Sequence, residues 1–151
     1  MRTFADLSEL MVLVGQEIAV SDWLTVTQEQ INLFAQATGD DQWIHVDAQR
    51  AKAGPFGATI AHGFLTLSLL PMFVKTALEI RNTRMAVNYG LNKVRFTAPV
   101  PVGSRLRGRI KLLACDPIEN DGMQVTWQVT VEREGGDRPV CIAESVTRRY
   151  A

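Results

Sequence analysis

A long apolar segment at residues 64–80 constrains the fold of this chain more than any other feature. It is apolar almost all the way round, which predicts a helix buried on most of its sides, with Pro71 inside it. Its most apolar part, residues 64–74, is too short to cross a membrane. The rest of the chain must therefore supply the surface that buries this helix.

The residues that follow this helix predict strands that can cover it. Residues 124–133 alternate apolar and polar side chains with a period of two, as in a strand with one buried face. Short turn sequences such as PVPVGS and EGGDRP separate successive strands and predict antiparallel neighbours. We therefore expect a four-strand meander over the following ranges: 86–97, 105–114, 124–133 and 140–150.

Residues 17–26 predict one further strand, after a short amphipathic helix at residues 7–14. The expected fold is α+β of the hot-dog type, with an antiparallel sheet of about five strands wrapped around the central helix. Such a sheet has a free edge, and one layer covers the helix incompletely. We therefore expect a homodimer that joins two sheets.

Between these elements, two shorter helices carry clear boundary signals. Thr27 and Gln30 form a capping box for a helix that ends at Gly39. Asp47 can cap a second helix at residues 48–53.

Composition and charge restrict the class of protein. The chain has 151 residues, 46% apolar and 21% charged, which predicts a single folded domain over residues 1–151. Sixteen basic and sixteen acidic residues cancel, so neither nucleic acid nor a membrane is expected as a partner. Cys115 and Cys141 form neither a disulfide framework nor a zinc motif. With no signal-peptide pattern at the N-terminus, we expect a soluble, cytoplasmic protein.

Both histidines of the chain lie in one short region rich in acids and glycines. The sequence GDDQWIHVD contains Asp40 and His45, and His62 follows in TIAHGF. Asp40 and His45 are five positions apart, so a helix would not place them on one face, and an extended chain would separate them by roughly 16 Å. They can cooperate only if the chain reverses after the preceding helix, which Gly39 permits.

A carboxylate and an imidazole on either side of one water molecule can take a proton from it and return one to a neighbouring carbon. The alternative is structural: an aspartate that caps a loop, and a histidine bound to a backbone carbonyl. Gly63 adds a second element, because an amide at the start of a buried helix can hold a carbonyl oxygen that becomes an enolate. Close packing is the alternative reason for this glycine. His45, Asp47 and His62 match no zinc spacing, so no metal is expected.

The segment ATGDDQWIHVDAQRAKAGPFGATIAHGFLTLSLLP resembles the MaoC-like, R-specific enoyl-CoA hydratases (hydratase 2). Their pattern is G-D-x-N-P-x-H, followed by H-G at the start of the hot-dog helix, and NYGLNKVRFTAPVPVGSRL is similar to the strand and turn after that helix. The resemblance implies that Asp40 and His45 are the catalytic pair and that Gly63 binds the thioester oxygen. Gln42 and Trp43 replace the usual Asn-Pro, which resembles the nodulation protein N branch.

The same resemblance implies the reaction and the remaining substrate contacts. Water adds reversibly to a trans-2-enoyl thioester of CoA, or of acyl carrier protein, and gives the R-3-hydroxyacyl product without a cofactor. Gln42 would keep the orienting role of the amide, and Trp43 would wall the acyl pocket. We also expect His62, Lys93, Arg95 and Tyr89 to bind substrate, although Tyr89 is equally well explained by packing on the sheet.

Two other functions remain open. A hot-dog thioesterase would attack the carbonyl of the same thioester, and an acyl-thioester binding protein would keep the pocket without turnover. The intact pair of Asp40 and His45 counts against the binding protein. Arg105, Arg107, Arg109 and Lys111 share one strand face, which is either a solvated surface or a contact for CoA phosphates or an acidic carrier protein.

Overall fold

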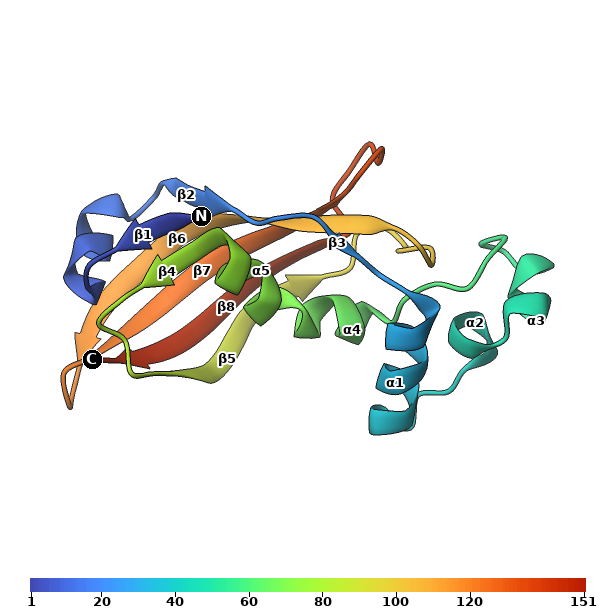
Figure 1. Cartoon of the computed structure of the whole chain (residues 1–151), viewed down its shortest axis with the longest axis horizontal. Helices are drawn as coiled ribbons and strands as arrows, with labels where there is room; N and C mark the ends of the chain where they lie inside the picture. The colour runs from blue at the N-terminus through green and yellow to red at the C-terminus, as the bar shows by residue number, and fades with distance from the viewer.

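The computed structural model describes all residues of the chain, 1–151. A long antiparallel sheet forms its body, and a helical segment lies across one face of this sheet (Figure 1). In chain order the elements are β1 (Arg2–Phe4), a 3-10 helix (Leu7–Leu13), β2 (Glu17–Val20), β3 (Leu24–Thr25), α1 (Gln28–Thr38), α2 (Trp43–Val46), α3 (Ala48–Lys52), α4 (Gly63–Ser68), α5 (Leu70–Ala77), β4 (Leu78–Ile80), β5 (Met85–Arg95), β6 (Arg105–Ile118), β7 (Gly122–Arg133) and β8 (Cys141–Tyr150).

The main sheet has the strand order β2-β6-β7-β8-β5, with the short β3 also paired to β6. The predicted meander is correct for β6, β7 and β8 but wrong for β5, which pairs with β8 instead of β6. The connection from β5 to β6 does not turn tightly, because it binds the chain that leads into α4. There Ala61 donates its amide to the carbonyl of Val100, and Val102 donates to the carbonyl of Thr59.

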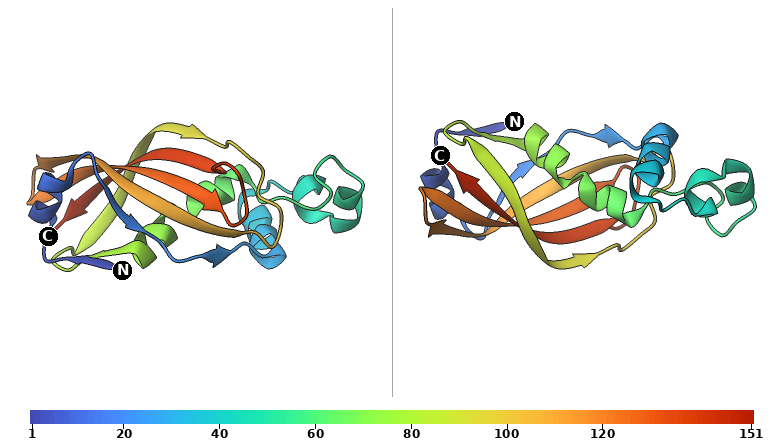
Figure 2. Two further views of the ribbon diagram at one scale, coloured as in Figure 1. Left: turned by 90° about the horizontal axis from the view of Figure 1, so that it is seen from above. Right: turned by 90° about the horizontal axis from the view of Figure 1, so that it is seen from below.

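The central helix is divided, and its two parts cross the sheet one after the other (Figure 2). The prediction of one helix over residues 64–80 is wrong in two respects. The helix is interrupted at Leu69, because Pro71 in the first turn of α5 has no amide hydrogen to continue the ladder. Its last three residues form β4, which pairs in parallel with β1.

Phe73 of α5 anchors the helical segment to the sheet. Its side chain is 1% exposed, and a Cβ added to Gly108 of β6 would lie 2.9 Å from the Cβ of Phe73. Gly108 thus permits the close approach of helix and sheet. Burial of one phenylalanine side chain stabilises the fold by about 1.5–3 kcal/mol. The core continues along the same face of the sheet through Leu106, Ile110, Leu112, Val125, Trp127, Val129 and Val131.

The helical segment is covered on one side only within a single chain. Phe64 of α4 is 66% exposed and Met72 of α5 is 46% exposed. The expectation of burial on most sides is therefore not met by one copy of the sheet. None of the helices has the length and apolar character needed to cross a membrane.

Candidate active site

The segment that carries the site projects beyond one end of the sheet, where α1, α2 and α3 gather (Figure 1). The capping box of Thr27 and Gln30 is present as predicted. Helix α1 ends at Gly39, whose φ of 78° lies in the left-handed region, so the chain reverses there at little cost. It then enters α2, a short helix that the sequence did not predict, and Asp47 caps α3 as expected.

His45 lies on α2 and is buried, with its ring oriented by the backbone. Its Nδ1 lies 2.7 Å from the carbonyl oxygen of Ile60. Because a carbonyl oxygen can only accept, Nδ1 carries the hydrogen and Nε2 of the neutral ring carries the free lone pair. His45 therefore offers an acceptor on the side away from Ile60.

His62 connects Asp40 to the ring of His45. Its Nε2 donates to the backbone carbonyl of Asp40 at 2.8 Å, and its ring stacks on that of His45 with the centroids 3.8 Å apart. Phe34 of α1 packs against the same ring, with centroids 4.9 Å apart. The Nδ1 of His62 is buried and has no hydrogen-bond partner. His62, which we expected to bind substrate, is thus buried against the two catalytic candidates, Asp40 and His45.

The chain reversal brings the three polar side chains together. A carboxylate oxygen of Asp40 and one ring nitrogen each of His45 and His62 all lie within 4.8 Å of one another. One water molecule can bridge groups at this separation with hydrogen bonds of ordinary length.

Gln28 fixes the position of α2, a role that no local pattern in the sequence indicates. From the first turn of α1, its Nε2 donates to the carbonyl of His45 at 2.8 Å. Its Oε1 accepts from the hydroxyl of Thr59 at 2.5 Å. These partners lie 17 and 31 positions away in the chain, so no local pattern connects them.

Gly63 opens α4 next to His62. Neither the amide of Gly63 nor that of Phe64 donates a hydrogen bond within the chain, and no side chain caps this helix. A Cβ on Gly63 would lie 2.8 Å from the ring of Phe96. The free donor and the need for close packing are therefore both present at this glycine.

Gln42 and Trp43, which replace the family's Asn-Pro, do not belong to the group of three converging side chains. Gln42 precedes α2, and its side chain is exposed and makes no hydrogen bond. The indole of Trp43 packs against Gly54, and the Arg50 guanidinium lies 4.5 Å from its ring centroid. Trp43 thus stiffens the contact between α2 and α3.

A cavity of about 710 Å³ lies between the helical segment and strands β5, β7 and β8. It reaches Leu67 and Ser68 of α4 but does not touch the three polar side chains at the end of the sheet. Tyr89 lines this cavity, whereas the other two substrate contacts expected on β5, Lys93 and Arg95, do not.

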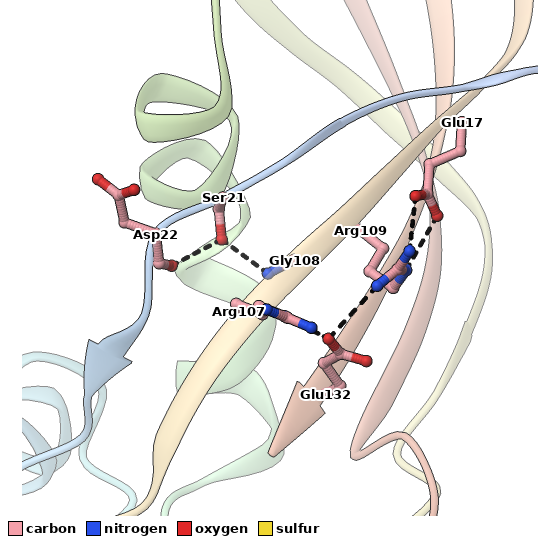
Figure 3. A network of polar contacts seen from close by, with 7 residues as sticks. All are labelled: Glu17, Ser21, Asp22, Arg107, Gly108, Arg109 and Glu132. Carbon is pink, nitrogen blue, oxygen red and sulfur yellow. Dashed lines mark hydrogen bonds and ion pairs between the residues drawn. The ribbon is translucent and has the colours of Figure 1, made fainter. Parts of the chain in front are cut away.

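The arginines of β6 are neutralised by acids on neighbouring strands, as Figure 3 shows for Arg107 and Arg109. Arg107 pairs with Glu132, and Arg109 pairs with Glu17 at 2.7 Å and with Glu132 at 3.7 Å. Arg105 pairs in the same way, with Glu134. This face is a network of surface ion pairs, and such pairing leaves these three arginines little charge for phosphates.

The chain is similar in sequence to known proteins of one family. The model of the "MaoC like domain" matches residues 10–134 of the chain. The 3-hydroxyacyl-thioester dehydratase Z of Mycobacterium tuberculosis is 53% identical over 151 residues, which cover 100% of both chains. Nodulation protein N of Rhizobium leguminosarum bv. viciae is 47% identical over 143 residues, which cover 93% of this chain and 89% of the relative.

Solved structures support the hot-dog fold. The R-hydratase PhaJ1 of Pseudomonas aeruginosa, in the unliganded form, superposes with a TM-score of 0.72 at 24% identity. The superposition covers 97% of this chain and 86% of that one. The α+β hot-dog fold expected from the sequence is thus confirmed.

Proposed function

The chain belongs to the MaoC-like dehydratase family of thioester hydro-lyases, and from this premise we propose that it hydrates trans-2-enoyl-CoA to R-3-hydroxyacyl-CoA, reversibly, through Asp40 and His45. The observation that carries the proposal is the convergence of the carboxylate and the imidazole to within 4.8 Å. A water molecule between these two side chains can donate a hydrogen bond to each of them.

The hydrogen bond from His45 to the carbonyl of Ile60 supports the following division of roles at this water. Neutral His45 accepts one water hydrogen at Nε2 and so orients the molecule. The carboxylate of Asp40 accepts the other and takes it as the water oxygen bonds to the β-carbon. The pair then returns one proton to the α-carbon, so the elements of water are added and neither residue is consumed. The family resemblance implies that this addition is syn.

The thioester oxygen gains negative charge as the β-carbon is attacked. Gly63 follows His62, which binds the backbone of Asp40, and its amide hydrogen is unpaired. This amide can therefore donate a hydrogen bond to the thioester oxygen. The cavity along α4 and α5 then offers an apolar space for the acyl chain. The R configuration is carried over from the family resemblance, and among the proteins compared it is the Pseudomonas protein that is named an R-hydratase.

Incubation with crotonyl-CoA tests the proposal against its rivals. Loss of the enoyl absorbance means hydration, release of free thiol means a thioesterase, and neither change means a binding protein. Coupling the product to an R-specific and then to an S-specific 3-hydroxyacyl-CoA dehydrogenase reports the configuration. Turnover with the S-specific enzyme alone would overturn the stereochemical part.

Asp40→Asn and His45→Gln should each lower kcat/KM for crotonyl-CoA by about 10²- to 10⁴-fold, because general acid-base catalysis contributes that much. Asp41→Asn is the matched control, since Asp41 is the adjacent exposed acid and makes no contact with the histidines. Near-normal turnover in either of the first two variants would exclude the Asp40–His45 mechanism.

We also propose a homodimer, a single domain, and a cytosolic location. The strand order ends at β5, whose outer edge is unpaired over eleven residues. Large apolar side chains on this strand are 44% to 59% exposed: Met85, Val87, Tyr89 and Leu91. Cys115 and Cys141 are both free and buried, and two unpaired cysteines fit a reducing compartment.

A further inference from the structure

Arg149 of β8 is a cation in the cavity wall that nothing in the chain neutralises. Its Nε is buried without a hydrogen-bond partner, and none of the ion pairs of the structure includes it. Its guanidinium carbon lies 5.5 Å from the ring centroid of Trp127. Burial lowers the pKa of Arg149 from its usual value, because desolvation disfavours the charged form. Within the single chain, this buried Nε donor therefore lacks the partner that buried polar groups normally have.

The position of Arg149 along the cavity indicates what this partner is. Ser145, Thr147 and Arg149 occupy alternate positions on β8 and line the cavity. Ser145 pairs in register with Leu91, and Arg149 with Ala86, so the cavity extends about 13 Å along these strands at about 3.3 Å per residue. Ser68 also lines the cavity, about 7.5 Å along α4 from Gly63 at about 1.5 Å per residue, and the C-terminal end of β8 lies at the end of the sheet away from α4 (Figure 1). Arg149 therefore lies at the end remote from the thioester position.

The walls between these two ends are apolar, with Leu67, Leu70, Val74, Leu78, Trp127 and Val129 among them. Such walls suit the methylene groups of an acyl chain. A terminal methyl group would cover the guanidinium without giving it an acceptor, whereas a carboxylate would bind it through two parallel hydrogen bonds. Lys75 of α5 also lines the cavity and adds a second positive charge.

We propose that the cavity takes the acyl chain of a thioester whose far end carries a carboxylate, and that Arg149 binds this carboxylate. The substrate class is then the monothioesters of medium-chain dicarboxylic acids. This inference rests on the proposed function, because that function places the thioester at Gly63.

The test compares two substrates of equal chain length, trans-2-decenoyl-CoA and trans-2-decenedioyl-CoA, in which a carboxylate replaces the terminal methyl. Native protein should prefer the carboxylate form in kcat/KM by about tenfold or more, because a charge-assisted pair is formed. Arg149→Met should abolish that preference. Arg149→Lys, which keeps the charge but not the planar fork, should retain part of it.

Arg148→Met is the matched control. Arg148 is the adjacent residue, but its guanidinium lies 3.7 Å from the ring centroid of Tyr89, its Nε donates to Gln124, and it does not line the cavity. This variant should keep the native preference. If Arg149→Met weakened both substrates equally, Arg149 would serve the CoA phosphates, the dimer or the fold, and the proposal would be overturned. If Arg149→Met failed to fold, the native protein would still decide the question. A native preference for the methyl-terminated substrate would by itself overturn the proposal.

The proposed reaction and this subsite can fail separately. If native protein hydrated neither substrate, the hydratase function would be wrong. The dissociation constants of the two thioesters, measured by calorimetry, would then decide the subsite: a tenfold ratio supports it, and equal constants reject it.

Discussion

His62 is 2% exposed and therefore presents almost no surface to a substrate. The sequence could place it near the thioester only because it precedes Gly63. The structure gives its ring two other tasks, a hydrogen bond to the backbone of Asp40 and a stack on His45. We therefore expect it to position the pair of Asp40 and His45.

Two variants of His62 separate these tasks. His62→Gln retains a donor for the Asp40 carbonyl but loses the aromatic face, and His62→Phe retains the face but loses the donor. Each should lower kcat for crotonyl-CoA by roughly tenfold or more, as small misplacements of catalytic groups do, and leave KM nearly unchanged. Steady-state kinetics on variants with native thermal transitions provide the measurement. A raised KM with native kcat would return His62 to the substrate-binding residues.

At the scale of elements, the site depends on how α1, α2 and the chain leading into α4 are held together. Gln28 alone joins the carbonyl of His45 to the hydroxyl of Thr59. The boundaries of α1 were predictable, since a capping box and a left-handed glycine act within a few residues. The existence of α2 was not, because its position depends on Gln28 and Ile60, which are remote in the chain.

Gln28→Leu should lower the free energy of unfolding by about 1–3 kcal/mol, because two buried or half-buried partners lose their hydrogen bonds. It should also lower kcat by displacing His45. Urea unfolding and crotonyl-CoA kinetics measure the two effects. Gln36→Leu is the control on the same helix, as Gln36 is exposed and makes no hydrogen bond. Equal behaviour of the two variants would show that the Gln28 contacts do not hold α2.

At the scale of the whole molecule, one partner can cover both the unpaired edge of β5 and the exposed side of α4 and α5. A second copy joined along β5 would pair the free edge and cover apolar side chains on both. β5 is the last strand of the sheet, and Figure 2 shows it at the margin.

Leu91→Glu should weaken this dimer by about tenfold or more, because a charge would be buried without a partner at the interface. Sedimentation velocity over a range of concentrations measures the association. Val12→Glu is the control, since Val12 is 80% exposed on the 3-10 helix, far in sequence from β5. A native monomer, or a Leu91→Glu variant as dimeric as the control, would contradict the proposed interface.

The sequence by itself determined the features that depend on near neighbours in the chain. Periodicity predicted the long strands, caps predicted the ends of α1 and α3, and two ordered motifs indicated the MaoC-like family, which the comparisons confirm. Only the tertiary structure decided the pairing of β5 with β8, the clamp of Gln28, the stack of His62 on His45 and the unpaired charge of Arg149. Each of these joins groups far apart in the chain, and their contact energies exist only once the backbone has brought them together.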